Sequence, residues 1–169
     1  MSKAFTRESD EVDREEVPSG RVQLPPGARN YITRKGADLL RQRLEALHEQ
    51  RRAEAGAGEK TDTKAAQRRV ESAIRRLQSI LDSVVIAGQP EDREKIAFGA
   101  SVVVKRGNEE EEAYTIVGID EAEPERGYIS WVSPLARALL GRRAGEVVRF
   151  RSPAGEQDLK VVKVCYGGE

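Results

Sequence analysis

Two carboxylates three residues apart are the part of this sequence best suited to chemistry. Glu59 and Asp62 lie in the segment AGAGEKTDT, with the hydroxyls of Thr61 and Thr63 beside them. Mg²⁺ prefers oxygen ligands and keeps some of its water when it binds. Two carboxylates alone hold Mg²⁺ weakly, so this pair could complete a site that another protein or a substrate supplies in part. The alternative is structural, since Asp62 or either threonine could cap a helix and leave Glu59 as a surface charge.

Other arrangements of reactive side chains are missing from the sequence. One histidine, His48, and one cysteine, Cys165, are too few for a metal cluster. His48 follows an apolar helix position, which favours a solvated helix face, and Cys165 fits an alternating strand. A lone cysteine cannot form an internal disulfide, which suits a reducing cytoplasm. No phosphate loop is present, because AGAG and YGG lack the required strand and helix around them.

The composition fits an elongated or two-part chain better than one compact core. Charged residues make up 34% and hydrophobic residues 38% of the 169 residues. The formal net charge is zero, which argues against a nonspecific nucleic-acid coat or a polybasic membrane anchor. No apolar run is long enough to cross a membrane, and MSKAFTRESDE has no hydrophobic signal core. We therefore expect a cytoplasmic protein with no membrane partner.

Two heptad patterns predict the elements that would present the acidic pair. The first follows Thr33, a suitable helix cap, and has its apolar positions at Ala37, Leu40, Leu44 and Leu47. The second has its apolar positions at Val70, Ile74, Leu77, Leu81 and Val84. Matching seams joined by a short turn predict an antiparallel coiled-coil hairpin over residues 30–86. Toward the turn the first seam becomes polar at Arg51 and Glu54, so the base is held together and the tip is free for another purpose.

Polar segments flank the hairpin on both sides. Residues 1–29 are rich in acidic residues, proline and glycine, which predicts a disordered acidic tail. After the second helix, Gly88 and Pro90 indicate a linker over residues 87–95.

From residue 96 to residue 169 the apolar period changes to two. The runs ASVVVKRG, AYTIVGID, GYISWVS, EVVRFRS and DLKVVKVCY predict five short strands. Between the third and fourth runs, Ser133 as a cap and Pro134 at the first position predict one short helix ending near Gly141. Trp131, on the strand before that helix, is expected in the core. The predicted fold class is α+β, a helical hairpin followed by a small antiparallel sheet with one short helix.

Two motifs are distinctive enough to compare with a known family. The hairpin opens with ITRKGADLL, and residues 133–148 read SPLARALLGRRAGEVV. FGASVVV, YTIVGIDE and SPAGE lie around the second motif. Together they resemble the Gre (GreA/GreB) transcript-cleavage factors of bacterial RNA polymerase. The resemblance covers about residues 30–166, leaves the acidic tail as an addition, and implies an FKBP-like fold for residues 96–169.

The resemblance also implies a partner and a role. A Gre factor docks on the rim of the polymerase secondary channel and inserts its coiled coil, and acidic residues at the tip help place Mg²⁺ and water. The polymerase then cuts its own backtracked RNA, so the factor is an accessory protein and not an enzyme. It would bind no cofactor tightly, share Mg²⁺ with the polymerase, contact nascent RNA indirectly and act as a monomer. By resemblance, the docking surface includes Asp120, Ser133, Pro134 and Leu135.

The tip departs from the family pattern. The hairpin is about ten residues shorter, roughly five per arm or ~8 Å of reach, which suggests a GreB-like variant with a shortened coiled coil. The family's D-x-x-E is replaced by Glu59-Lys-Thr-Asp62, an E-x-x-D in reversed order. A shorter arm leaves a second possibility open, a regulator that occupies the channel without stimulating cleavage, as in the nucleoside-diphosphate-kinase regulator family. A third, from the FKBP-like fold alone, is a prolyl isomerase.

Overall fold

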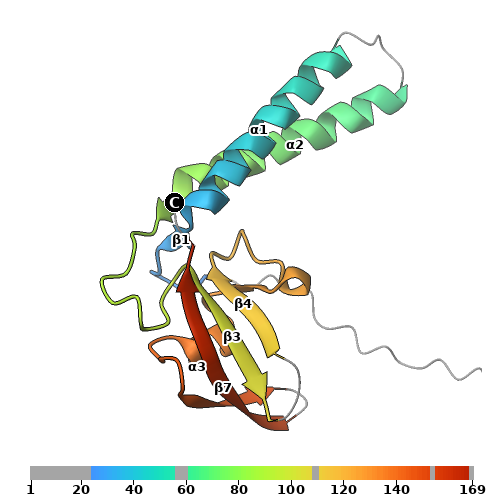
Figure 1. The fold of residues 1–169 in the computed structure, drawn as a ribbon. Coiled ribbons are helices and arrows are strands. Elements are labelled where there is room, and N and C mark those ends of the chain that lie inside the picture. The colour runs from blue at the N-terminus through green and yellow to red at the C-terminus, as the bar shows by residue number, and fades with distance from the viewer. Residues whose placement is uncertain (1–23, 56–60, 108–110, 153–154, 168–169) are drawn as a thin grey trace, which may run out of the picture.

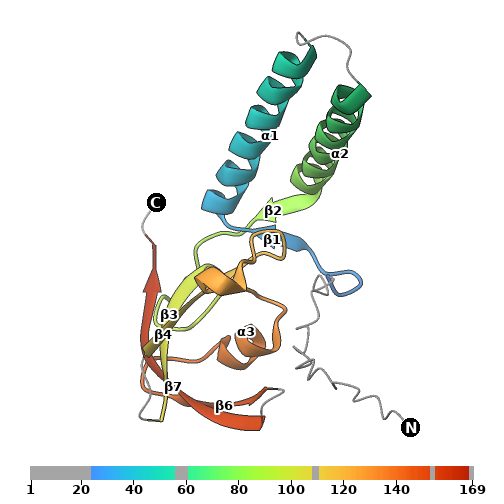
Figure 2. The same ribbon diagram turned by 90° about the vertical axis from the view of Figure 1, so that its right-hand side faces the viewer.

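The computed structural model describes residues 24–55, 61–107, 111–152 and 155–167. Two long helices project together from one end of a small sheet, as the two views at right angles show (Figures 1 and 2). The mixture of helices and a separate sheet confirms the predicted α+β class. The predicted acidic tail falls almost wholly outside the described residues.

The two helices form the hairpin, and the residues between them lie outside the described part of the chain. Helix α1 spans Arg34–Ala55 and helix α2 spans Thr61–Ser83. They run in opposite directions side by side (Figure 2). The most buried seam side chains are Ala37, Val70, Ile74 and Leu77, with exposed fractions of 0%, 6%, 4% and 9%. Ala37, Ile74 and Leu77 lie in the half of each helix nearer the sheet, and Val70 lies near the middle of α2, so the hairpin is well packed from its base to about half its length.

A short parallel ladder closes the base of the hairpin. Strand β1 (Asn30–Ile32) leads into α1, and strand β2 (Val84–Ile86) follows α2 directly. The two pair in parallel, with Tyr31 opposite Val85. The prediction that Val84 continues the helical seam was therefore wrong, because α2 ends at Ser83 and a β-branched residue suits the strand that follows.

The remaining strands form one five-stranded sheet in the order β5-β4-β3-β7-β6. Their bounds are Ala100–Arg106 for β3, Glu111–Val117 for β4, Tyr128–Ser130 for β5, Val147–Ser152 for β6 and Gly155–Tyr166 for β7. The five predicted strands are confirmed. The sheet is not wholly antiparallel as predicted, however, because β4 and β5 pair in parallel while the other pairs are antiparallel. The connection between β4 and β5 carries the 3-10 helix η1 (Pro124–Arg126). It brings the chain back so that β5 lies at the edge of the sheet beside β4 and runs in the same direction.

One hydrophobic core lies between the sheet and helix α3 (Pro134–Leu139). Alternate β3 side chains supply Val102 and Val104, and α3 supplies Ala136 and Leu139, all four fully buried. Their inward positions follow the period of two along the strand and the helical spacing of α3. Trp131 is half-buried and packs against this cluster, as expected. We call the described portion of residues 96–167 the β-rich part.

None of the helices in the described part of the chain combines the length and apolar character that crossing a bilayer requires.

Candidate functional site

Of the predicted acidic pair, the structure describes only the backbone of Asp62, at the end of α2 far from the sheet. Helix α2 begins at Thr61, so Asp62 is in its first turn and Glu59 precedes it by two positions. Glu59 and the side chain of Asp62 lie outside the described part of the structure. The two Mg²⁺ ligands that the resemblance implies are these same side chains. Among the side chains that the structure describes, no group of three or more His, Cys, Asp or Glu residues is placed to hold a metal ion.

Three of the four predicted docking residues share one turn at the start of α3. The Ser133 hydroxyl accepts the N–H of Ala136 at 3.2 Å, so Ser133 is the helix cap that the sequence predicted. Leu135 is half-buried and packs against the core. Pro134 is exposed at the first helical position. Of these three, Pro134 is therefore the residue most available to a partner.

Asp120, the fourth predicted docking residue, already has a partner within the chain. Its Oδ2 accepts a hydrogen bond from Nδ2 of Asn30 at 3.1 Å, and the side chain is half-buried. Asn30 begins β1, at the base of the hairpin. The structure thus places Asp120 where the hairpin meets the β-rich part.

A neighbouring carboxylate that the sequence analysis did not single out, Glu121, accepts three hydrogen bonds at this place. We call residues 30–36 together with 118–121 the junction. Glu121 accepts hydrogen bonds from the backbone N–H of Thr33 and of Gly118, each at 2.9 Å, and also from the Thr33 hydroxyl. Glu121 thereby joins the residue that caps α1 to the turn after β4.

The sequence held a signal for this contact. Gly36 lies in the first turn of α1, where glycine is unfavourable compared with other residues unless close packing requires it. Its N–H donates to the Thr33 hydroxyl at 2.9 Å, which confirms Thr33 as the cap. Glu121 itself reads in the sequence as one of several surface acids in DEAEPE.

Residues 92–95, within the predicted linker, are attached to the β-rich part by ion pairs and by a tyrosine. The Arg143 guanidinium pairs with Asp92, at 2.7 Å, and with Glu94. Desolvation acts to raise the pKa of Asp92, but the N–H of Glu94 and the charge of Arg143 outweigh it and hold this pKa below its ordinary value. The Tyr166 hydroxyl donates to the backbone oxygen of Lys95 and accepts the N–H of Ala97 at 2.8 Å, and burial raises the pKa of that phenol.

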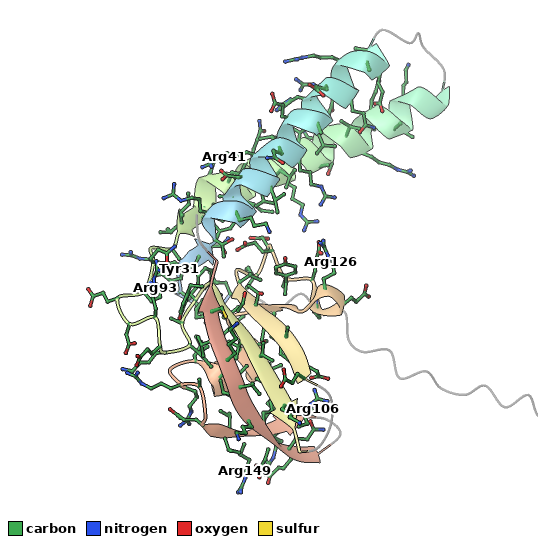
Figure 3. All side chains as sticks on the ribbon, in the orientation of Figure 1. Tyr31, Arg41, Arg93, Arg106, Arg126 and Arg149 are labelled. Carbon is green, nitrogen blue, oxygen red and sulfur yellow. The ribbon has the colours of Figure 1, made fainter. Side chains whose placement is uncertain are left out.

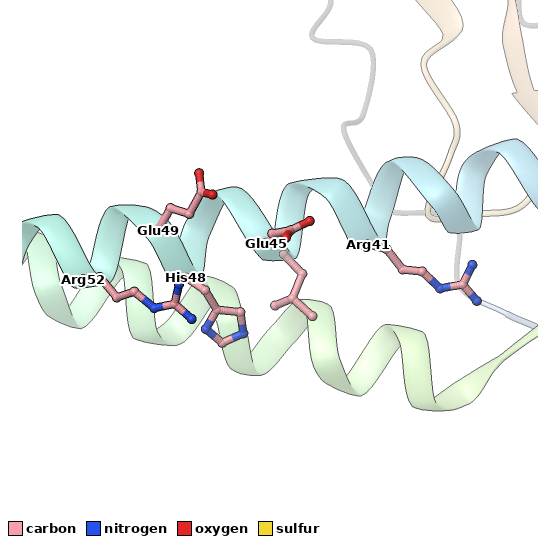
Figure 4. Close-up of a pocket in the computed structure, with 6 residues that line it drawn as sticks. Arg41, Glu45, His48, Glu49 and Arg52 are labelled. Carbon is pink, nitrogen blue, oxygen red and sulfur yellow. The ribbon is translucent and has the colours of Figure 1, made fainter.

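A shallow cavity of about 320 Å³ lies along α1 (Figure 4). Its lining residues are Arg41, Leu44, Glu45, His48, Glu49 and Arg52. They come from one helix, and basic and acidic side chains alternate along it. His48 is half-buried here, which differs from the predicted solvated position. Because the charges oppose one another along the cavity, the arrangement does not favour a ligand of either sign.

Comparisons with known proteins agree with the fold and with the motifs. A family model described as "Transcription elongation factor, GreA/GreB, C-term" matches residues 89–166. Transcription elongation factor GreB of Neisseria meningitidis serogroup A is 34% identical over 155 residues, covering 82% of this chain and 94% of that protein. Transcription elongation factor GreA of Geobacillus kaustophilus is 36% identical over 149 residues, covering 79% and 94%. The similarity therefore extends through both the hairpin and the β-rich part.

A solved structure, GreA factor homolog 1 of Thermus thermophilus, is 26% identical and covers 82% of this chain and 99% of that one, with a TM-score of 0.39. The curated relatives define the class, proteins of transcription elongation. This chain belongs to the GreA/GreB family of transcription elongation factors.

Proposed function

We propose that this elongation factor docks on bacterial RNA polymerase through its β-rich part and inserts its hairpin into the secondary channel. The tip carboxylates Glu59 and Asp62 would then help to place Mg²⁺ and water, and the polymerase would cut its own backtracked RNA. The observation that carries this proposal is the alignment with GreB over 94% of that protein. The alignment includes both the hairpin, which would enter the channel, and the β-rich part, which would dock on the polymerase.

The arrangement of the two parts suits this division of labour. Helix α1 has 22 residues, which corresponds to a length of roughly 33 Å. The hairpin projects away from the sheet rather than covering it (Figure 1). A polar tip carried on a packed base can enter a narrow space while the β-rich part stays outside.

The finer architecture belongs to the same proposal. The hairpin is an antiparallel coiled coil over residues 30–86, residues 87–95 form the linker, and residues 96–169 form an FKBP-like domain. The buried apolar positions of α2, spaced by four and then three residues at Val70, Ile74 and Leu77, support the coiled coil. We expect the factor to act in the cytoplasm as a monomer and to contact nascent RNA indirectly.

In this proposal the chain is an accessory factor and the polymerase is the enzyme. A hard cation held by only two carboxylates keeps most of its coordination open to other ligands. The polymerase would therefore supply the remaining ligands, and Mg²⁺ would be shared and not bound tightly by this chain.

RNA cleavage in a purified, backtracked elongation complex tests the role of the tip. The variant Glu59→Ala/Asp62→Ala is expected to lose transcript shortening and to keep its polymerase binding. The matched control is Glu71→Ala/Asp82→Ala, which removes two exposed carboxylates from the same helix pair and should cleave as the unaltered chain does. Loss of binding by the tip variant would instead assign Glu59 and Asp62 to folding or docking.

One observation favours a second candidate, a channel regulator without cleavage activity. The alignment with GreB has 155 positions, but it includes only 82% of the 169 residues of this chain, which is about 139 residues. The relative therefore has residues that lack a counterpart in this chain, which agrees with a shortened hairpin. Bound polymerase with no transcript shortening by the unaltered chain would support the regulator and contradict the cleavage factor.

A further inference from the structure

Glu121 completes the cap of α1 through hydrogen bonds whose direction is fixed. The Thr33 hydroxyl has one proton, which it donates to Glu121, so its oxygen is left to accept the N–H of Gly36. The other carboxylate oxygen accepts the N–H of Thr33 and of Gly118. The partial positive charge at a helix N-terminus also favours a carboxylate there. A side chain of the β-rich part thus serves as part of the hairpin's own helix cap.

Two glycines make room for this carboxylate. A Cβ on Gly36 would lie 1.9 Å from Glu121 Oε1 and 2.2 Å from its Cδ. A Cβ on Gly118 would lie 2.3 Å from the backbone oxygen of Tyr31 and 2.9 Å from Glu121 Oε2. All these distances are far below normal contact. Gly118 therefore allows the hairpin base to approach the turn after β4 closely, and Gly36 leaves the space that the Glu121 side chain occupies.

The junction controls the direction in which both helices point. Because β1 precedes α1, β2 follows α2 and the two strands pair, the helices share one base. Tyr31 in β1 also contacts the rings of Phe98 and Trp131, with centroids 6.1 and 6.2 Å apart, and lies where the hairpin meets the sheet (Figure 3). For a helix of roughly 33 Å, a rotation of about 10° at the base moves the far end by about 6 Å.

We propose that Glu121 is a positioning residue that holds the hairpin at a fixed angle to the β-rich part. Its importance for activity rests on the proposed function, because the angle decides whether a docked factor delivers its tip to the polymerase active site. The angle itself is a property of the free chain. It can therefore be measured without polymerase.

The first experiment measures the distance distribution between the two parts of the full chain by electron spin resonance. Spin labels are attached at Ser79→Cys on α2 and Lys163→Cys on β7, both exposed positions, with Cys165→Ser to prevent other labelling. We expect a narrow distribution for the unaltered junction and a broadened or shifted one for Glu121→Ala. The matched control is Glu123→Ala, which removes a nearby exposed carboxylate whose ion pair, with Arg126, is local.

The second experiment uses the contact between Gly36 and Glu121. Gly36→Ala is expected to displace the carboxylate, to broaden the distance distribution as Glu121→Ala does, and to lower the thermal midpoint. In the Glu121→Ala background the obstructing atoms are gone, and alanine is the better helix former. The same Gly36→Ala substitution should then raise the thermal midpoint. A residue with a merely general structural role would not reverse the sign of this effect.

The outcomes separate the two proposals. An unchanged distance distribution in Glu121→Ala, or a lower midpoint for Gly36→Ala in both backgrounds, overturns the positioning role. If Glu121→Ala fails to fold, the distribution of Gly36→Ala decides, since that variant keeps every charge. If Glu121→Ala broadens the distance distribution but the unaltered chain does not bind polymerase, the positioning role is supported and only the proposed function is contradicted.

Discussion

At the scale of single residues, the turn between η1 and β5 depends on Gly127. Its φ of 79° lies in the left-handed region, and a Cβ there would lie 2.6 Å from the backbone oxygen of Ala113. Two separate effects therefore oppose any side chain at this position: backbone strain and collision with a strand that cannot easily move.

Gly127→Ala and Gly141→Ala separate these two effects. Gly141 has a similar φ of 81° but open space around its Cβ position. Gly141→Ala should lower the free energy of unfolding by about 1–2 kcal/mol, from strain alone. Gly127→Ala should lower it further, because Ala113 must also shift. Urea unfolding of both variants measures the difference, and equal losses would mean that strain accounts for the whole effect.

The charge of Asp92 links the attachment of the linker to pH. Because the pKa of this carboxyl lies below its ordinary value of 3.8 in the folded chain, folding favours the ionised form. The resulting stabilisation is present at neutral pH and is lost as pH falls through the lowered pKa. Asp92→Asn should therefore be less stable than the unaltered chain at pH 7, and the difference in stability should disappear as the pH falls through the lowered pKa of Asp92.

Urea midpoints at several pH values test this expectation, with Glu91→Gln, an exposed neighbour, as the control. A gap that stays constant from pH 7 to acid pH would show that the ionisation of Asp92 does not contribute.

At the scale of elements, α3 is short and depends strongly on its cap. It has six residues, and the Ser133 side chain satisfies one of the free N–H groups at its start. Ser133→Ala should lower the free energy of unfolding by about 1 kcal/mol, whereas Ser133→Asp, which keeps an acceptor, should lose less. Chemical denaturation distinguishes them. Equal losses would show that capping is not the role of this hydroxyl.

The elements that the sequence predicted are those whose patterns are local. Half-buried strands alternate in period two and packed helices repeat in heptads, so both could be read from neighbouring residues. The parallel pairing of β4 with β5 could not, because it depends on where the intervening connection returns the chain. The same holds for β1 and β2, whose three residues each pair across more than fifty positions of sequence.

The residues of the candidate site also differ in how far the sequence could predict their roles. Ser133 and Thr33 were predictable as caps, because a cap is recognised from the few residues that follow it. The partners of Asp120 and Glu121 were not, since both acids contact residues about ninety positions away. Long-range contacts of this kind have no local pattern, although Gly36 at the start of a helix was an indirect sign.

At the scale of the whole molecule, the proposal assigns entry into the channel to the hairpin and docking on the polymerase to the β-rich part. Residues 30–86 carry 12 Lys and Arg against 8 Asp and Glu, whereas residues 91–169 carry 12 against 15, although the net charge of the chain is zero. Two surfaces of opposite character suit a protein that meets different regions of one large partner. Changes to one part should then affect a different step from changes to the other.

Pro134→Asp tests this separation at the proposed docking surface. Aspartate is favourable in the first turn of a helix, so α3 should remain folded while an apolar contact is replaced by a charge. We expect polymerase binding to weaken at least tenfold, or about 1.4 kcal/mol. The control is Pro124→Asp, the same substitution at an exposed proline that begins η1.

Concentration then distinguishes docking from chemistry. If Pro134→Asp weakens only binding, a higher concentration of the variant should refill the polymerase and restore RNA cleavage, because occupancy follows mass action. The same increase should not rescue Glu59→Ala/Asp62→Ala, whose defect would lie after binding. Titration of both variants into a backtracked complex measures this. Rescue of the tip variant, or failure to rescue Pro134→Asp at saturating binding, would contradict the assignment of docking to the β-rich part and chemistry to the tip.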